Sequence, residues 1–371
     1  GISGKYYFTY DHVLDWAILP DYSQIESDAP QIDVNTTFTL YYPEKRPFFM
    51  ERKSFFETPI EIFHSRTIND PVGAFKFAGG IGGYKIGYIG AYDQHTPWVI
   101  PFAENSYSVS SKEKSFSNIV RINKDVSKST HFGLLSTNRD LISNGFNRIL
   151  SCDGIIYFFN NYSLRYQGIV SWTREPDDTS IYAGSSSLDF GDHTSRFDGE
   201  EWWGKGFYFN FNHSSKYLNV NVLYKGLSPE FRADNGFIQY NDFESRDLTT
   251  TFNFRVNRFY VESILPGFGI RQDTKFLGSQ KEFEKSASLS IQFLKQIYAS
   301  VAYKLLDKQH QNIFFDNIWS YNAYLLAPPI KYFSTGIFCT YGRQINYNTS
   351  PVSLGYIWYP SLWLEVIAGK L

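Results

Sequence analysis

The sequence has few of the residues that build metal centres and disulfide frameworks. It contains two cysteines, Cys152 and Cys339, which lie far apart and in no C-x-x-C or zinc-binding spacing. The two cysteines can form one disulfide or remain two inert thiols, and their spacing favours inert thiols. The seven histidines form no H-x-x-x-H or H-E-x-x-H motif. The sequence therefore predicts no metal site and no cofactor.

Long apolar runs and a surplus of positive charge are also missing. No stretch approaches the roughly 20 apolar residues of a membrane helix. The 35 Lys and Arg residues face 37 Asp and Glu residues, which gives a net charge of −2. Because nothing in this balance would neutralise phosphates, we expect no nucleic-acid partner. The chain begins at Gly1 rather than at Met, so we expect a processed or partial chain.

Catalytic motifs are absent as well. The sequence contains no G-x-S-x-G, the usual nucleophile motif of hydrolases. Residues 79–83 are rich in glycine, but no G-K-[ST] and no helix-forming segment follows, so they predict a hairpin turn rather than a phosphate loop. We predict that the protein is not an enzyme. A hydrolase assembled from serine, histidine and acidic residues of different strands stays open.

What the sequence does contain is aromatic residues and a two-residue alternation of apolar and polar side chains. Aromatic residues make up 19% of the chain, and they favour strands and form the girdles of transmembrane barrels. Between residues 216 and 224, Leu218, Val220 and Val222 alternate with Asn219 and Asn221. The same alternation recurs along the chain, whereas no amphipathic helix of useful length is found.

The polar faces of these segments separate a membrane barrel from a soluble sandwich. They carry mainly small uncharged groups and amides, which suit a wet lumen better than a charged outer surface. Short connections, such as 212–215, alternate with long polar ones at 94–112, 175–201 and 304–316. We predict one all-β domain over residues 1–371, an antiparallel transmembrane β-barrel of about 16 strands, with a range of about 14 to 18.

The least generic stretch covers residues 21–51. An acidic, turn-rich run leads into a short alternating segment at 36–42. The charged triplet 44–46 then stands between Pro43 and Pro47. Each proline fixes its own φ and pushes the preceding residue out of the α region, so we expect an extended triplet.

This stretch and two others, at 227–237 and 121–140, resemble a largely uncharacterised outer-membrane β-barrel family of Bacteroidota-type bacteria. Its members are described as carbohydrate-binding family 9 domain-containing proteins. The family signature contains D-x-S-Q-x-E-x-D, N-T-x-F and P-E-K-R-P-F-F-x-E. The matching positions are Asp21, Ser23, Gln24, Glu26, Asp28, Asn35, Thr36, Phe38, Pro43, Glu44, Lys45, Arg46, Pro47, Phe48, Phe49 and Glu51.

The resemblance implies a fold and a location but no catalytic residues. It implies a barrel in the outer membrane of a Gram-negative bacterium, with lipid as one partner and with the family's N-terminal carbohydrate-binding module absent from this chain. The first functional hypothesis is a conduit or uptake component for small polar solutes or glycan fragments. The alternative is a plugged barrel that serves as an anchor or as a subunit of an envelope complex for secretion, assembly or glycan capture.

Candidate binding residues come from the same stretch. Phe48-Phe49 and Phe55-Phe56 need burial, which favours an inward fold of residues 21–59 with the charged triplet in an ion-pair network; a solvated rim is the alternative. Acidic turn residues can also hold Ca²⁺, but their spacing fits no EF-hand, and we predict no metal. Trp98, Trp202 and Trp203 can stack on sugars, although packing in loops or in an interface girdle is favoured. The predicted lumen or plug residues are Asp21, Gln24, Glu26, Asp28, Asn35, Glu44, Lys45 and Arg46.

Overall fold

Most of the protein's residues lie in strands. The computed structural model describes residues 1–20, 36–182, 190–310, 313–330 and 333–366. Within these ranges, eighteen strands belong to one sheet, and β5 (Thr96–Pro101) with β6 (Ser106–Ser111) forms a second sheet. Helical turns are short: α1 (Pro47–Met50), η1 (Lys53–Phe56), η2 (Ser65–Thr67) and η3 (Leu294–Gln296). The predicted all-β, antiparallel class is confirmed, and the eighteen strands lie at the upper end of the predicted range.

No helix in the described ranges is long and apolar enough to cross a membrane.

The chain divides into two compact units, which are described separately. Unit 1 comprises Gly1–Tyr157, Leu164–Phe209 and Lys225–Glu244. Unit 2 comprises Phe158–Ser163, Asn210–Tyr224 and Ser245–Leu371.

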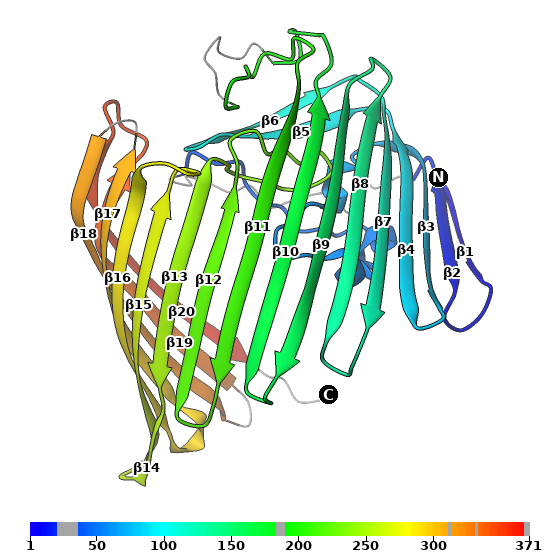
Figure 1. Cartoon of the computed structure of the whole chain (residues 1–371). Helices are drawn as coiled ribbons and strands as arrows, with labels where there is room; N and C mark the ends of the chain where they lie inside the picture. Colours follow the sequence, from blue (N-terminus) through cyan, green and yellow to red (C-terminus); the bar gives the residue numbers. More distant parts are fainter. Residues whose placement is uncertain (21–35, 183–189, 311–312, 331–332, 367–371) are drawn as a thin grey trace. The chain divides into compact units, whose positions relative to one another are not determined.

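Unit 1 contains the N-terminal strands (Figure 1). From β1 to β9, omitting the separate pair β5 and β6, each strand pairs antiparallel with the next in sequence order. The strands are β1 (Ile2–Tyr7), β2 (Val13–Ile18), β3 (Pro71–Ile81), β4 (Tyr84–Asp93), β7 (Ser115–Asp125), β8 (His131–Leu141), β9 (Phe146–Phe158), β10 (Tyr162–Arg174) and β11 (Glu201–Ser214).

The glycine-rich stretch forms the hairpin turn that the sequence predicts. Ile81 of β3 pairs with Tyr84 of β4, so the turn consists of Gly82 and Gly83. Their φ angles are 58° and 79°, a region in which glycine lacks the steric penalty of other residues. The turn therefore has a conformational role, and no helix follows it.

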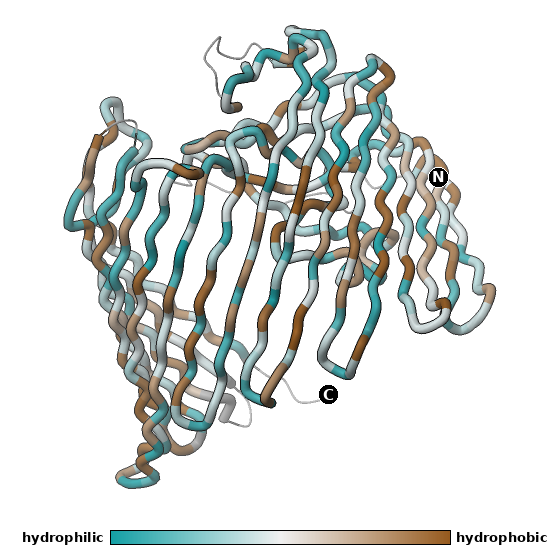
Figure 2. The backbone as a smooth tube through the Cα atoms, viewed as in Figure 1, coloured by the Kyte–Doolittle hydropathy of each residue, from teal (hydrophilic) through white to brown (hydrophobic). Residues whose placement is uncertain are grey.

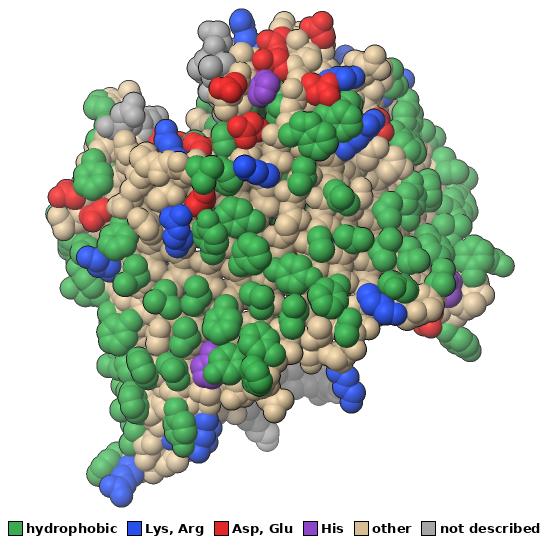
Figure 3. Space-filling view, in the orientation of Figure 1, with side chains coloured by type: hydrophobic (Ala, Val, Ile, Leu, Met, Phe, Trp, Pro, Cys, Tyr) green, Lys and Arg blue, Asp and Glu red, His purple; other side chains and the backbone are tan. Residues whose placement is uncertain are grey.

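The two faces of the unit 1 strands have the reverse of the usual polarity. On β10, the buried face carries Gln167, Ser171 and Thr173, all at most 1% exposed, with Ile169 between them at 3%. The other face carries Val170, which is 47% exposed, and Trp172. A soluble protein buries its apolar face and exposes its polar one. Figure 2 shows this alternation along the strands, and Figure 3 shows apolar side chains covering the outward face.

Unit 2 is a run of long strands, each paired antiparallel with the next from β14 to β20. Most of β12 (Leu218–Leu227) and β13 (Phe243–Phe252) also belongs to this unit. The later strands are β14 (Phe254–Arg258), β15 (Val261–Thr274), β16 (Gln280–Phe293), β17 (Tyr298–His310), β18 (Ile313–Ile330), β19 (Phe333–Asn346) and β20 (Ser353–Val366).

One predicted connection is wrong. The sequence predicts a long polar link at 304–316, but β17 continues to His310 and β18 begins at Ile313. The polar residues of this stretch lie in a strand because they face charged partners on β16. Lys308, for example, pairs with Glu282 at 3.3 Å.

Candidate functional site

Two irregular segments of unit 1, residues 43–68 and 228–241, cover the polar face of its strands. We call these segments the plug, and we call strands β2–β4 and β7–β11 the wall. The plug contains only short helical turns (Figure 1). Pro47 starts α1 at its first turn, where a missing N–H costs nothing, and Arg52 precedes the next turn, η1, as its N-cap with a φ of 58°. Irregular backbone in a buried place leaves many polar groups that need partners.

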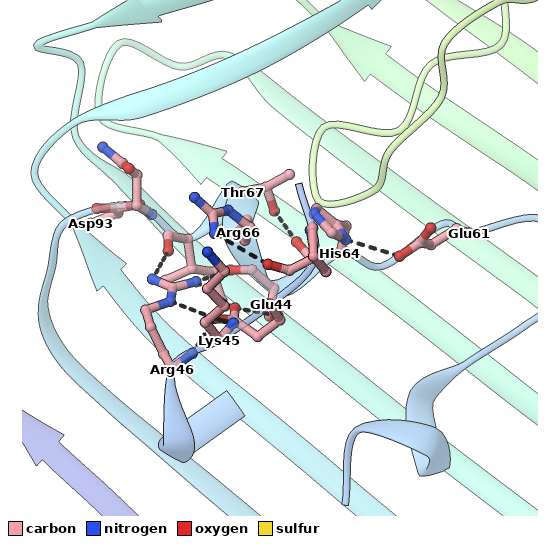
Figure 4. A network of polar contacts seen from close by, with 12 residues as sticks. Glu44, Lys45, Arg46, Glu61, His64, Arg66, Thr67 and Asp93 are labelled. Atoms are coloured by element: carbon pink, nitrogen blue, oxygen red, sulfur yellow. Dashed lines mark hydrogen bonds and ion pairs between the residues drawn. The ribbon is translucent and has the colours of Figure 1, made fainter. Parts of the chain in front are cut away.

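A buried ion pair organises the first plug segment (Figure 4). Arg46 Nη2 lies 2.7 Å from Glu44 Oε2, and both side chains are at most 3% exposed. The same guanidinium donates to the carbonyl oxygens of Ile68 at 2.7 Å and Ser65 at 2.8 Å. The ion pair thus ties the two ends of the segment together, while Lys45 lies exposed.

The carboxylate of this pair is held in its ionised form. Glu44 accepts hydrogen bonds from Arg46, from the Ser65 hydroxyl at 2.6 Å and from the Lys45 amide at 2.9 Å. Burial raises the pKa of a carboxyl, but these bonds and the Arg46 charge outweigh it and lower the pKa of Glu44 to about 2. The pair therefore stays charged at neutral pH.

Arg139 on β8 joins the wall to three other segments. Its side chain is fully buried. It donates to the Thr67 carbonyl at 2.7 Å, the Pro97 carbonyl at 3.0 Å and Asn235 Oδ1 at 3.1 Å. Asn235 also accepts a bond from Ser117 of β7 at 2.9 Å. One wall side chain therefore holds both plug segments and the β5 strand.

A second buried cation, Arg232, holds the other plug segment. It donates to Glu175 Oε1 at 2.6 Å and to Asp234 Oδ1 at 2.7 Å. Asn147 of β9 completes this centre: it donates to the Arg232 carbonyl at 3.2 Å and accepts from the Asp234 amide at 3.0 Å. Trp98 Nε1 lies 3.2 Å from the second Asp234 oxygen.

Glu175 is the unusual member of this centre. Its second oxygen, Oε2, is buried and has no hydrogen-bond partner among the described residues. Burial raises the pKa of Glu175 to about 7, against the lowering effect of the Arg232 charge and hydrogen bond. The group therefore changes charge near neutral pH, next to a turn of the plug.

Further wall side chains satisfy the backbone of the plug. Gln167 of β10 accepts from the Ile60 amide at 2.7 Å and donates to the Ile60 carbonyl at 3.3 Å. Lys76 of β3 donates to the Glu51 carbonyl at 3.1 Å. Trp202 of β11 donates to the Glu230 carbonyl at 2.8 Å. These contacts explain why the wall carries buried polar residues.

An apolar core lies between plug and wall. It contains Phe49, Phe56, Ile62, Ile68 and Phe231 from the plug, each at most 3% exposed, together with Ile119, Leu135, Ile149 and Ile169 from the wall. Burying a side chain of this size stabilises a fold by about 1.5–3 kcal/mol. The plug and the wall therefore share a buried apolar core.

Two cavities flank the plug at opposite ends of the wall strands. The turn end is where Gly82 and Gly83 join β3 to β4, and the loop end is where residues 94–114 connect β4 to β7. The loop-end cavity, of about 490 Å³, is lined by Thr37, His64, Arg66 and Trp98. The turn-end cavity, of about 990 Å³, is lined by Arg52, Glu57, Tyr84, Arg121, His131 and Arg165. Strand β4 runs from Tyr84 at the turn end to Asp93 at the other, about 30 Å at about 3.3 Å per residue. Plug residues line both cavities.

The predicted site residues fall into two groups. Asp21, Gln24, Glu26, Asp28 and Asn35 lie outside the described residues. Of the triplet, the structure brings Glu44 and Arg46 together in the buried pair. The Lys45 side chain is exposed, and its backbone amide donates to Glu44.

Sequence reasoning missed most of the wall contacts. Arg139, Arg232 and Asp234 lie within the stretches that carry the family resemblance, and that was the available signal. No such signal marks Glu175, because in the sequence it is an ordinary polar residue that follows a strand.

Sequence reasoning also missed a charge cluster on the polar face of unit 2. Arg271 lies between Asp273 and the carboxylates of Glu282 and Glu284, and Lys304 lies 3.0 Å from Glu284. Farther along the strands the face changes to hydroxyls, where Ser290 and Ser300 lie 2.9 Å apart.

The tryptophans and cysteines can also be placed. Trp98 and Trp202 belong to strands and are at most 3% exposed, so they pack in the interior, whereas Trp203 is 61% exposed. Cys152 and Cys339 are both free thiols, as the spacing favours. Among the described residues, no group of three His, Cys, Asp or Glu side chains is placed to hold a metal ion.

Comparisons with known proteins give limited matches. Residues 1–77 match the model of a domain of unknown function, DUF5916. No curated protein matches the chain. The fold is similar to a solved structure described as a bacterial polysaccharide outer membrane secretin, at 8% identity and a TM-score of 0.34, covering 82% of this chain and 95% of that one. A likeness this weak carries no argument.

Proposed function

We propose that the protein is a plugged conduit of the outer membrane, which takes up small polar solutes or glycan fragments after the plug moves. The single observation that carries this proposal is the plug itself, which is hydrogen-bonded to the wall and flanked by a cavity at each end. The plug has a polar interface with the wall, whose hydrogen bonds water can replace at little net cost, and solvent-sized space lies on both sides of it.

The membrane location rests on the reversed polarity of the sheet. Large apolar side chains are exposed on the outward face of unit 1, among them Leu134, Leu150 and Val170, at 48%, 60% and 47%. An exposed apolar surface of this kind is covered by lipid in membrane barrels. We propose that the single domain closes as a barrel, in the outer membrane of a Gram-negative bacterium, as in the Bacteroidota family with the carbohydrate-binding family 9 module. A barrel of eighteen strands encloses an aqueous channel unless it is plugged.

The second candidate is a permanently plugged anchor or a subunit of an envelope complex. The dense core around Phe56 and Phe231 favours it, because opening exposes that core to water. We propose no catalytic role for either candidate.

Ion conductance in planar bilayers separates the candidates. We expect no steady current from the intact protein. A variant with Arg139→Met and Gln167→Leu removes wall contacts to the plug, and we expect it to give discrete current steps. Ser136→Ala, on the outward face of β8, is the matched control and should stay closed.

Three results would decide against the plugged conduit. A steady open current from the intact protein would contradict the plug. Silence of the double variant, while hydrogen exchange shows that its plug has loosened, would support the anchor. Current steps from the Ser136→Ala control would show that the effect does not arise at the plug.

A further inference from the structure

An aromatic and basic cluster lies on the outward face of unit 1, where strands β8 to β11 meet the long loops. Trp172 and Trp203 stack with their ring centroids 5.1 Å apart and their planes at 3°. Phe146 packs edge-on against Trp172 at 4.7 Å. The guanidinium carbons of Arg148 and Arg174 lie 4.3 Å and 5.1 Å from the Phe146 ring centroid. The cluster thus combines aromatic rings with cations on the outside of the sheet.

The cluster has donors to spare. The side chains of Arg148 and Arg174 are 47% and 44% exposed. Arg148 lies 3.2 Å from Asp140, and Glu201 accepts from Arg174 Nε at 2.6 Å. These carboxylates fix the two guanidinium groups but occupy only part of the five N–H donors of each. An anion can therefore bind without breaking the ion pairs.

The position of the cluster along the strands fits a lipid headgroup level. Toward the turn end of β10, the outward residues are Val170, Gly168, Tyr166 and Leu164, none of them charged. The ten residue steps from Arg174 to Leu164 span about 33 Å, which a strand tilt of about 40° reduces to about 25 Å. That is the height of the apolar band of an outer-membrane barrel.

We propose that this cluster binds the phosphate groups of membrane lipids in the leaflet at the loop end. The proposal rests on the membrane location proposed above. Guanidinium groups bind phosphate oxygens in a bidentate manner, and tryptophan favours the membrane interface. Lys205 is exposed on the same face of β11, two residues from Trp203.

Tryptophan fluorescence in proteoliposomes tests the proposal. Brominated phosphatidylglycerol and brominated phosphatidylcholine each quench the tryptophans that they touch. The ratio of the quenching by the two lipids measures the preference for an anionic headgroup. In the double variant Arg148→Gln with Arg174→Gln, we expect the preference for the anionic lipid to fall by a factor of about five for each arginine removed. Arg255→Gln with Arg258→Gln, exposed residues of β14, gives the same change of net charge and should retain it. Trp203→Phe should remove part of the quenching by a headgroup-level label.

The outcomes separate the proposal from its premise. An unchanged preference in the Arg148 and Arg174 variant overturns the lipid site while leaving the membrane location intact. Loss of the preference on adding millimolar inorganic phosphate would show a site for free phosphate and overturn the lipid source. Absence of quenching by both lipids would overturn the membrane location and this proposal together.

Discussion

The buried carboxyl of Glu175 predicts that the plug is held more loosely above neutral pH. Its pKa in the folded protein is about 7, compared with an ordinary value of 4.5 for a glutamate. Because the folded value is the higher one, the folded state binds the proton more tightly. The stabilisation is complete below about pH 4.5 and is lost as the pH rises through about 7. The difference corresponds to about 3 kcal/mol.

Hydrogen exchange of residues 228–241 measures this effect locally. The Asp234 amide donates to Asn147, and the Phe237 amide donates to the Glu61 carbonyl at 3.0 Å. After correction for the intrinsic pH dependence of exchange, we expect protection to fall by about 100-fold between pH 5 and pH 8, the equivalent of about 3 kcal/mol. Glu175→Gln should make protection independent of pH in this range.

A matched control separates the buried group from general effects of pH. Glu57 is an exposed carboxyl of the plug, and Glu57→Gln should leave the pH dependence unchanged. Equal protection of the intact protein at pH 5 and pH 8 would refute the reasoning, and so would an increase with pH.

Two substitutions test the plug from other sides. Arg46→Ala leaves the buried Glu44 carboxylate without its cation, which should cost about 3–5 kcal/mol; proteolysis within residues 43–68 should become faster, and unchanged cleavage would show that the pair is dispensable. Gly87→Ala on β4 places a Cβ 2.4 Å from Phe55 and 2.8 Å from Phe56; we expect faster exchange of residues 53–56, whereas Gly80→Ala, with its nearest atom at 3.7 Å, should have little effect.

Much of the fold was predictable because its strands follow a simple alternation. On β16, Ser286, Ser288 and Ser290 alternate with Ala287 and Leu289, and the structure pairs this strand in register with both neighbours. The two-residue period fixes which side chains share a face, whatever the rest of the chain does. The link predicted at 304–316 is wrong. A strand whose polar face carries many charged residues has the polar composition of a loop, so the two resemble each other in sequence.

The site was less predictable because its contacts are long-range. Glu44 and Arg46 are two residues apart and flanked by prolines, so a local pattern could identify them. Arg139 and Asn235 are 96 residues apart, and Arg232 and Glu175 are 57 apart. Nothing in the neighbourhood of Arg139 reveals that its partners are plug carbonyls, because any residue type can supply a carbonyl.

The polar faces of the two units solve one problem in different ways. The polar groups on a strand face need hydrogen-bond or ion-pair partners. In unit 2, Arg271 and the acidic side chains around it form ion pairs with one another. In unit 1 the partners are mainly backbone groups of the plug, which Arg139 and Gln167 bind. Hydrogen bonds can be exchanged for water at little net cost, typically about 1 kcal/mol each, whereas exposing the apolar core is costly. In the proposed opening, exposure of the core around Phe56 and Phe231 opposes movement of the plug, whereas loss of the wall partners leaves buried plug carbonyls without hydrogen bonds and favours it.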